Sequence, residues 1–411
     1  MVLEKYLVLN AGSSSLKFSV YNPVDETVIG SGNIEKIGED ISIATFKING
    51  EKITFEEKLN NHSEAVNLLL EKLVQLGYVN DLKEVKAVGH RILHGGEIYN
   101  DSVLIDDEVI ENIKGLINLG PLHLPSEIDC INNITDVLPE ANQVAVFDTS
   151  FHQTIPDYNY RYAVPKEWYE ENGVRKYGFH GTSHKFINQE MQTYSDKPLN
   201  LIICHLGNGS SISAVKEGKC IDTTMGLTPL DGLIMGTRSG AIDPSIIEYI
   251  CKARNLTVKQ ATKILNSQSG LIGLCSKNDL RDIEVLYNAG NEDAILAYNM
   301  LVKSITHNII SYYLELEGNV DAIVLTAGIG ENSAYVRKGI VNRLSKILPV
   351  KLNEQKNEAI AGFKEEHSGT ITTEDSQLPI IVMPTNEELM ILKDTKRIVQ
   401  EKESNISKKL A

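Results

Sequence analysis

The sequence has 411 residues, with 40 lysine and arginine side chains against 55 aspartate and glutamate side chains, and a formal net charge of −15. This acidic balance argues against a protein that wraps nucleic acid or lies on an anionic membrane, because both partners require a broad cationic face. Its 42% hydrophobic and 23% charged residues are typical of a globular protein, and its length suggests two or three domains.

Cysteine usage and apolar segments give the expected compartment. Five cysteines lie scattered without a C-x-x-C pair, at Cys130, Cys204, Cys220, Cys251 and Cys275. This spacing is typical of buried thiols in a reducing cytosol. The first residues lack the basic start and apolar core of a signal peptide, and no apolar run approaches the ~18 residues of a membrane span. We expect a cytoplasmic protein with no membrane partner.

Two hairpins with glycine turns are predicted about half a chain apart. In residues 6–22 an apolar run enters a small-residue turn and leaves in an alternating strand, and residues 201–215 have the same shape. A shift of 195 residues superposes Gly12 on Gly207 and Ser15 on Ser210. The pair suggests a duplicated unit, although two unrelated hairpins explain it about equally well.

The rest of the chain alternates strands and helices. A third glycine turn, Ala327 to Asn332, follows the β-branched run 322–326 and leads into a helix from Ser333. Further helices are predicted at 62–76, 244–254, 257–266 and 294–317, and a strand at 380–383 precedes a helix that runs from 385 to about 403. This pattern indicates an α/β protein with helix-covered sheets. We expect an N-terminal α/β domain of residues 1–150, onto which a C-terminal helix at about 386–411 packs, and a nucleotide-binding α/β domain of residues 151–385.

Several short segments have the composition of a phosphate site. Glycine turns after strands let backbone N–H groups surround phosphate oxygens, although no G-x-x-x-x-G-K-[ST] motif is present. Arg91 and Arg238 are flanked by glycine or small residues, a context suited to binding phosphate or carboxylate. Asp148 follows a predicted strand at the end where α/β sheets bind ligands. A salt-bridge arginine or a turn aspartate explains each residue equally well.

Two features have competing structural explanations. His90/His94 and His180/His184 share an i, i+4 spacing that could bind zinc on a helix, but glycines nearby disfavour helices and no glutamate follows the first histidine. Thr385-x-x-Glu388 matches a capping box, so Glu388 has a structural explanation. Glu387 lies outside that box, and its carboxylate either favours the helix dipole or points toward a divalent cation.

Taken together, these segments resemble the acetate kinase (acetokinase) family. The motifs that carry the resemblance are Asn10-Ala-Gly-Ser-Ser-Ser-Leu-Lys17, His90-Arg-Ile-Leu-His-Gly-Gly96, Phe147-Asp-Thr-Ser-Phe-His-Gln153, Tyr177-Gly-Phe-His-Gly-Thr-Ser-His184, His205-Leu-Gly-Asn-Gly-Ser-Ser211, Met235-Gly-Thr-Arg-Ser-Gly240, Gly328-Ile-Gly-Glu-Asn332 and Thr385-Asn-Glu-Glu388. They follow the family's order over nearly the whole chain.

The resemblance implies a fold, a reaction and an assembly. The fold is two duplicated actin-like ATPase (ribonuclease H-like) α/β domains flanking a nucleotide cleft, as in sugar kinases and chaperone ATPases. The reaction is reversible, direct in-line transfer of the γ-phosphoryl group of ATP to acetate, which gives acetyl phosphate and ADP. Mg²⁺ is the implied cofactor, with Mn²⁺ as an alternative ion, and the implied assembly is a homodimer.

The resemblance also assigns roles to single residues. Arg91 and Arg238 would hold the carboxylate and the transferred phosphoryl group, and His180 would donate a hydrogen bond in the transition state. Asp148 would orient the reacting groups. Asn10 and Glu387 match the positions associated with Mg²⁺.

Two larger sets follow from the same resemblance. The substrate-binding set comprises Arg91, Leu93, Leu122, His123, Phe179 and Pro229. The ATP-binding set comprises Ser13, Ser15, Lys17, His205, Leu206, Gly207, Asn208, Gly209, Asp279, Leu280, Arg281, Gly328, Ile329, Gly330, Glu331 and Asn332.

The sequence departs from the family pattern at a few positions, and two alternatives stay open. Leu124 stands where asparagine commonly follows His123, and Leu93 stands where valine is common. The first alternative is a propionate or butyrate kinase of the same fold. The second is a non-catalytic actin-like ATP-binding protein, since a fold does not fix a function.

Overall fold

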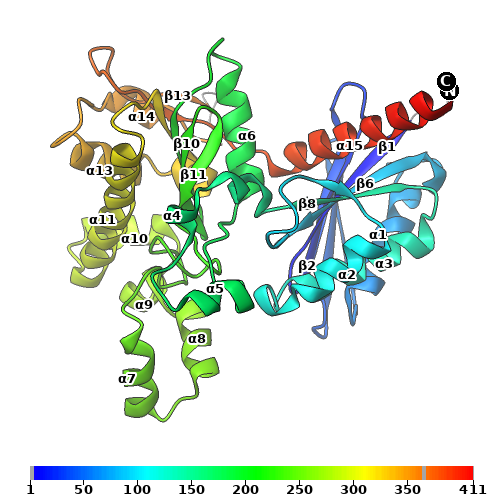
Figure 1. The fold of residues 1–411 in the computed structure, drawn as a ribbon, viewed down its shortest axis with the longest axis horizontal. Helices are drawn as coiled ribbons and strands as arrows, with labels where there is room; N and C mark the ends of the chain where they lie inside the picture. The colour runs from blue at the N-terminus through cyan, green and yellow to red at the C-terminus, as the bar shows by residue number, and fades with distance from the viewer. Residues whose placement is uncertain (1–3, 363–366, 411) are drawn as a thin grey trace. The chain divides into compact units, whose positions relative to one another are not determined.

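The computed structural model describes residues 4–362 and 367–410, and the chain divides into two compact units (Figure 1). Unit 1 comprises Met1–Ser150 and Asn386–Ala411, and unit 2 comprises Phe151–Thr385. Residues 1–3, which enter the signal-peptide argument, and residue 411, the predicted end of the last helix, lie outside the described residues.

Unit 1 contains an eight-stranded sheet in the order β5-β4-β3-β2-β1-β6-β8-β7. Its strands are β1 (Lys5–Ala11), β2 (Ser15–Tyr21), β3 (Val28–Glu35), β4 (Ser42–Ile48), β5 (Glu51–Glu57), β6 (Val85–Ile92), β7 (Val103–Leu104) and β8 (Asn142–Phe147). Its helices are α1 (His62–Gln75), α2 (Asp107–Gly115), α3 (Leu124–Val137) and α15 (Glu387–Leu410), with 3₁₀ turns at Leu82–Glu84 and Ile117–Leu119.

Helices cover both faces of the central strands of unit 1 (Figure 1). Because side chains alternate along a strand, Leu7 and Leu9 of β1 enter the core shared with α1 and α3. Tyr6 and Val8 point to the opposite face and pack with Ile391 of α15. The last helix therefore completes the first unit of the chain.

Unit 2 contains a six-stranded sheet in the order β11-β10-β9-β12-β14-β13. Its strands are β9 (Leu201–Leu206), β10 (Ser210–Lys216), β11 (Lys219–Thr223), β12 (Ala322–Thr326), β13 (Gly369–Thr370) and β14 (Ile380–Val382). Its helices are α4 (Asp157–Tyr160), α5 (Lys166–Asn172), α6 (Gly181–Gln192), α7 (Ser245–Arg254), α8 (Val258–Ser267), α9 (Gly270–Cys275), α10 (Leu280–Asn288), α11 (Glu292–Glu315), α12 (Ala327–Asn332), α13 (Ala334–Leu344) and α14 (Glu354–Ala359). A 3₁₀ turn spans Ser150–Thr154.

The two sheets share one central topology. In unit 1, β1 pairs antiparallel with β2 and parallel with β6, and β8 runs parallel to β6. In unit 2, β9 pairs antiparallel with β10 and parallel with β12, and β14 runs parallel to β12. Each unit adds a third antiparallel strand beside its hairpin, β3 or β11. The predicted fold class, duplicated α/β units with helix-covered sheets, is confirmed.

Most predicted elements are confirmed, and three local predictions are wrong. Both glycine-turn hairpins form, as β1–β2 and β9–β10. The segment 327–332 is the short helix α12 instead of an open turn, and α6 begins at Gly181, where a glycine seemed to disfavour a helix. The helix after 385 is capped by Asn386, whose Oδ1 accepts a hydrogen bond from the N–H of Leu389 at 3.0 Å, and not by Thr385.

No helix within residues 4–362 or 367–410 combines the length and apolar character needed to cross a membrane.

Ile391 tests the packing of α15 on unit 1. Its side chain is fully buried, so Ile391→Ala should lower the free energy of unfolding by about 2–5 kcal/mol and lower the urea midpoint accordingly. Ile406→Ala on the same helix is the control, because Ile406 is 48% exposed, and it should change stability by less than about 0.5 kcal/mol. Equal midpoints for the two variants would contradict this packing.

Candidate functional site

An ion pair lies at the carboxyl ends of adjacent parallel strands of unit 1. Arg91 is near the end of β6, and Asp148 directly follows β8. Asp148 Oδ2 accepts hydrogen bonds from Arg91 Nε at 3.1 Å and Nη2 at 2.5 Å, while Arg91 Nη1 donates to Asn10 Oδ1 at 3.1 Å. The Asp148 side chain is 1% exposed and that of Arg91 is 16% exposed. One edge of the guanidinium is therefore fixed by the carboxylate.

The charges of this ion pair also affect the pKa values of two further carboxyl groups of unit 1. Burial raises the pKa of Glu127, on α3, to about 8, against the opposing charge of Arg91. Burial, together with the charge of Asp148, raises the pKa of Glu387 to about 7, although Arg91 and Lys17 lower it. Burial lowers the pKa of Arg91 itself, but the charge and hydrogen bonds of Asp148 outweigh burial and the net shift is upward. The guanidinium therefore stays charged.

The β1–β2 hairpin, which carries Ser13, Ser15 and Lys17 of the predicted ATP-binding set, lies beside the start of α15. Ser13 is exposed in the turn, and the turn closes through a hydrogen bond from Gly12 N to the Ser15 carbonyl at 2.7 Å. Lys17 is opposite Asn10 in the β1–β2 register. It also lines a cavity of about 450 Å³ together with Lys47, Asn386 and Glu388.

The residues predicted for the acyl pocket are divided between the two units. In unit 1, Leu93 is buried and Leu122 is 71% exposed, while His123 occupies the N-cap position of α3. A Cβ placed on Gly120 would lie 3.1 Å from Leu93 Cδ2 and 3.1 Å from Leu124 Cγ, so the two leucines flank this glycine. In unit 2, Phe179 is buried and Pro229 provides the carbonyl that accepts from Arg238 Nη1 at 3.3 Å.

In unit 2, His180 and Arg238 lie close to Gly209, in the turn between β9 and β10. A Cβ on Gly209 would lie 3.4 Å from His180 Nε2 and 3.5 Å from Arg238 Nη1. Burial lowers the pKa of Arg238. The His180 ring stacks on that of His205, with centroids 4.2 Å apart. His180 has a left-handed backbone (φ 58°), which costs about 1–2 kcal/mol and places its ring at the start of α6.

The histidines of the predicted zinc alternative are engaged by neighbouring polar groups. His184 Nε2 contacts Ser211 Oγ and its Nδ1 contacts Ser213 Oγ, both at 2.8 Å. His90 Nε2 contacts Gln143 Oε1 at 2.9 Å, and His94 Nδ1 accepts from the N–H of Gly96. In the described parts of the chain, no three His, Cys, Asp or Glu side chains gather closely enough to hold a metal ion.

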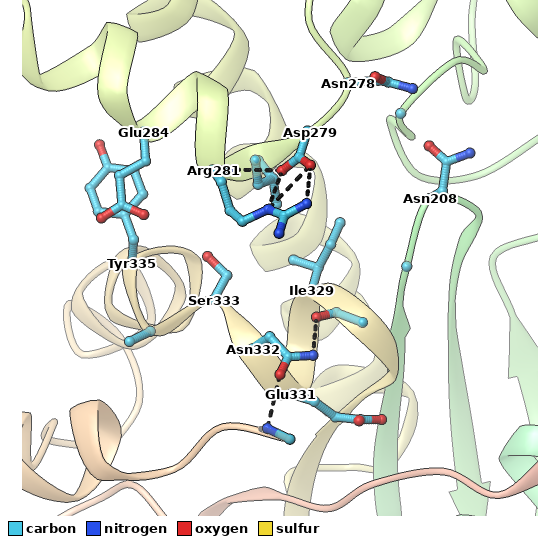
Figure 2. Close-up of a pocket in the computed structure, with 16 residues that line it drawn as sticks. Asn208, Asn278, Asp279, Arg281, Glu284, Ile329, Glu331, Asn332, Ser333 and Tyr335 are labelled. Carbon is cyan, nitrogen blue, oxygen red and sulfur yellow. Dashed lines mark hydrogen bonds and ion pairs between the residues drawn. The ribbon is translucent and has the colours of Figure 1, made fainter. Parts of the chain in front are cut away.

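A cavity of about 890 Å³ opens in unit 2 between α10, α12 and the β9–β10 turn that contains Gly207 and Asn208 (Figure 2). Asn208 and Asn278 lie at one side of it, and Glu284 and Tyr335 lie at the other. Asp279 and Arg281 join through an ion pair of 2.6 Å, and the Arg281 hydrogen bonds lower the pKa of Asp279 to about 2. This volume suits a nucleotide-sized ligand.

Comparisons with known proteins identify the family of this chain. The acetokinase family model matches residues 5–393. The chain belongs to the acetokinase family. The acetate kinase of Clostridium novyi is 46% identical over 402 residues, which cover 96% of this chain and 98% of that protein. The acetate kinase of Thermoanaerobacter pseudethanolicus is 47% identical over 404 residues, or 96% and 99% of the two chains.

Solved structures of the acetokinase family share the fold. The acetate kinase of Porphyromonas gingivalis superposes with a TM-score of 0.90 at 37% identity, covering 96% of this chain and 100% of that one. A propionate kinase from Francisella tularensis superposes with a TM-score of 0.89 at 41% identity and the same coverage. These two structural relatives are therefore named for different acids, acetate and propionate.

The unit 2 cavity brings together most of the nucleotide residues expected from the acetokinase resemblance. Its lining includes Gly207, Asn208, Asp279, Leu280, Arg281, Gly328, Ile329, Glu331 and Asn332. Ser13, Ser15 and Lys17 belong to unit 1. His205, Leu206, Gly209 and Gly330 are absent from the lining, and of these His205, Leu206 and Gly330 are buried.

The lining also includes residues that the sequence did not indicate, namely Gly236, Asn278, Glu284, Ser333, Ala334, Tyr335 and Gly362. Ser333 to Tyr335 adjoin the predicted glycine segment and could have been included by adjacency. A Cβ on Gly236 would lie 1.9 Å from Asn208 Oδ1, so a side chain at this position would displace the Asn208 amide. No sequence signal indicates Gly362.

Arg337 of α13 fixes one wall of the cavity. Its guanidinium is fully buried and donates to the carbonyls of Gly330, Glu331, Asn357 and Ile360 and to Asn357 Oδ1, at 2.6 to 3.1 Å. All five N–H donors of an arginine are thereby used. The end of α12 is thus tied to the segment that leads to Gly362.

Glu127 gives a prediction for stability against pH. Its pKa is raised from 4.5 to about 8 in the folded chain. Folding therefore gains stability from this group below about pH 4.5 and loses that gain as the pH rises through about 8. Between about pH 5 and about pH 9, the melting temperature of Glu127→Gln should fall less than that of the wild type.

Gln keeps an oxygen that can accept from the N–H of Leu93, as Glu127 Oε2 does at 3.1 Å, so the comparison isolates the charge. The control is Glu140→Gln at an exposed position, which should retain the wild-type pH dependence. A Glu127→Gln profile that parallels the wild type would show that this carboxyl does not titrate in the fold.

Proposed function

We propose that this chain is an acetate kinase that transfers the γ-phosphoryl group of ATP to acetate, reversibly and with Mg²⁺, by direct in-line displacement. The observation that carries the proposal is the complete acceptor-side set: Arg91 fixed by Asp148 in unit 1, and Arg238 beside His180 in unit 2. A non-catalytic ATP-binding protein of this fold has no need of such a set. The family membership supports the same conclusion.

The unit 2 cavity binds ATP in this proposal. The phosphates lie at the loop that carries Gly207 and Asn208, where small residues let backbone N–H groups approach. The nucleoside lies toward Asp279, Arg281 and the N-terminal end of α13. Ser13, Ser15 and Lys17 of the β1–β2 hairpin are proposed as further phosphate-binding residues. In this arrangement the γ-phosphoryl group is the part of ATP that reacts near Arg91 and Arg238.

Arg91 binds the acetate carboxylate, and Arg238 binds the moving phosphoryl group. A carboxylate is already ionised near pH 7, so the nucleophile requires no general base. Catalysis then consists of alignment and of neutralising charge on the phosphoryl oxygens. Asp148 holds the Arg91 fork in one orientation, and His180 donates a hydrogen bond to the transferred group.

Asn10, Glu387 and Asp148 fit a Mg²⁺ site. They offer hard oxygen donors, and Mg²⁺ is usually held by one or two carboxylates together with substrate phosphates and water. Burial and, after it, the charge of Asp148 raise the pKa of Glu387, and a bound cation would favour its charged form. When bound, Mg²⁺ neutralises charge on the β- and γ-phosphate oxygens. Mn²⁺ satisfies the same donor set.

We further propose a cytoplasmic homodimer. Helix α7 contributes no buried side chain, and on it Tyr249 is 75% exposed and Ile246 is 45% exposed. Exposed apolar side chains gathered on one helix mark an association surface. The molar mass in solution, measured by light scattering, tests this part.

The acid preference follows from Leu93. Leu93 stands where valine is common in the family, and its longer side chain would leave less room for a longer acyl chain in the proposed pocket. One extra methylene changes discrimination by only ~1–3 kcal/mol, so propionate should be a poorer substrate and not an inert one. The propionate kinase among the structural relatives makes this acid the second candidate.

The activity is tested by ADP formation from ATP and Mg²⁺ with acetate, with propionate and with neither, while hydroxylamine traps the acyl phosphate. We expect acetate-dependent ADP and hydroxamate, with a higher kcat/KM for acetate than for propionate. No acid-dependent product would remove the kinase proposal. A higher propionate value would assign the chain to the second candidate.

Arg238→Ala tests the electrostatic part of the mechanism. Removing a group that stabilises charge only in the transition state should lower kcat at least about 10²-fold while the fold is retained. Arg343→Ala, at an exposed position on α13, is the control and should keep the wild-type kcat. Near-normal turnover by Arg238→Ala would exclude Arg238 from the reaction.

A further inference from the structure

Ser211, on β10, holds two histidines at once. Its Oγ lies 2.9 Å from His180 Nδ1 and 2.8 Å from His184 Nε2. The other ring nitrogen of His184, Nδ1, lies 2.8 Å from Ser213 Oγ. A continuous row of hydrogen bonds therefore runs from Ser213 through His184 and Ser211 to His180.

Two arrangements of this row are possible when Ser211 donates its proton within it; if the Ser211 oxygen instead accepts from both histidines, His180 carries its proton on Nδ1. A serine hydroxyl has one proton to donate, and a neutral imidazole has one protonated and one bare nitrogen. His184 is neutral, because burial lowers its pKa well below the usual range and His152 and His205 lower it further. In the two arrangements, Ser211 thus donates to one of the two histidines and accepts from the other.

The two arrangements give His180 opposite tautomers. If His184 Nε2–H donates to Ser211, then Ser211 donates to His180 Nδ1, and a neutral His180 carries its proton on Nε2. If Ser211 donates to His184 instead, it accepts from His180 Nδ1–H, and Nε2 of a neutral ring is bare. Only the first arrangement gives a neutral His180 that can donate from Nε2.

We propose that Ser211 is a positioning residue that fixes both the ring orientation and the Nε2–H tautomer of His180. Nε2 is the nitrogen on the side of Gly209 and Arg238, where the phosphoryl group is placed in the proposed reaction. In this tautomer the Ser213 hydroxyl donates to His184 Nδ1, His184 Nε2–H donates to Ser211 Oγ, and the Ser211 hydroxyl donates to His180 Nδ1. The choice of the Nε2–H tautomer and the role of the donated hydrogen bond both rest on the proposed function, whereas the contact of Ser211 with both histidines does not.

A pair of serine variants tests the inference. Ser211→Ala and Ser213→Ala each remove one hydroxyl that contacts His184, but only Ser211 contacts His180. Ser211→Ala should lower kcat at least about tenfold, as removal of groups that orient functional histidines does, and should change the KM for ATP and acetate less. Ser213→Ala keeps the contact between Ser211 and His180 and should lower kcat less than Ser211→Ala does. Equal kcat values for the two variants would overturn the proposal.

The tautomer is measured directly on the wild-type chain by ¹⁵N NMR of labelled histidines at about pH 8, where free imidazole is neutral. The His180 signals are identified by their loss in His180→Gln. We expect a protonated Nε2 and a bare Nδ1, and in Ser211→Ala a mixture of tautomers. A protonated Nδ1 in the wild type would overturn the proposal even if Ser211→Ala does not fold. Because this spectrum requires no turnover, it stays informative if the chain shows no acetate-dependent activity.

Discussion

Arg91 and Asp148 leave neighbouring parallel strands at one edge of the unit 1 sheet, and their opposite charges allow both side chains to be withdrawn from water. A single buried charge would be expensive at this position, whereas the pair is compensated. The ion pair also sets the pKa values around it, since Glu127 and Glu387 both respond to the charges of Arg91 and Asp148. The proposed carboxylate and metal positions therefore both depend on this one contact.

The net charge of −15 is a property of the outer surface and does not oppose anion binding. In the proposed function anion affinity is local: backbone amides of the glycine loop, Lys17 and Arg238 would bind phosphate oxygens, and Arg91, held by the buried Asp148, would bind the carboxylate. Arg337 in unit 2 is also a buried guanidinium. Five hydrogen bonds to backbone and amide oxygens replace its contacts with water. Both units thus use arginine as a fixed fork of donors.

Sequence patterns were sufficient for features that depend on local periodicity. Alternating apolar residues predicted the β1–β2 and β9–β10 hairpins, and a strand end drew attention to Asp148. Features that depend on distant partners were not predictable. Thr385 and Asn386 are both good N-caps, but Thr385 Oγ1 is engaged by Ser183, 202 residues away in sequence, so Asn386 caps α15. The roles of Arg337 and Gly362 likewise arise from segments that meet only in the folded unit.

The central claim is that the phosphoryl group passes directly from ATP to the carboxylate. Asp148 Oδ2 already accepts two hydrogen bonds from Arg91, which suits it to orientation and not to attack on phosphorus. The most direct test is the stereochemistry of transfer from ATP made chiral at the γ-phosphorus with oxygen isotopes. Direct in-line transfer predicts inversion of configuration in acetyl phosphate. Retention would show two successive displacements through a phosphorylated side chain and would contradict direct transfer.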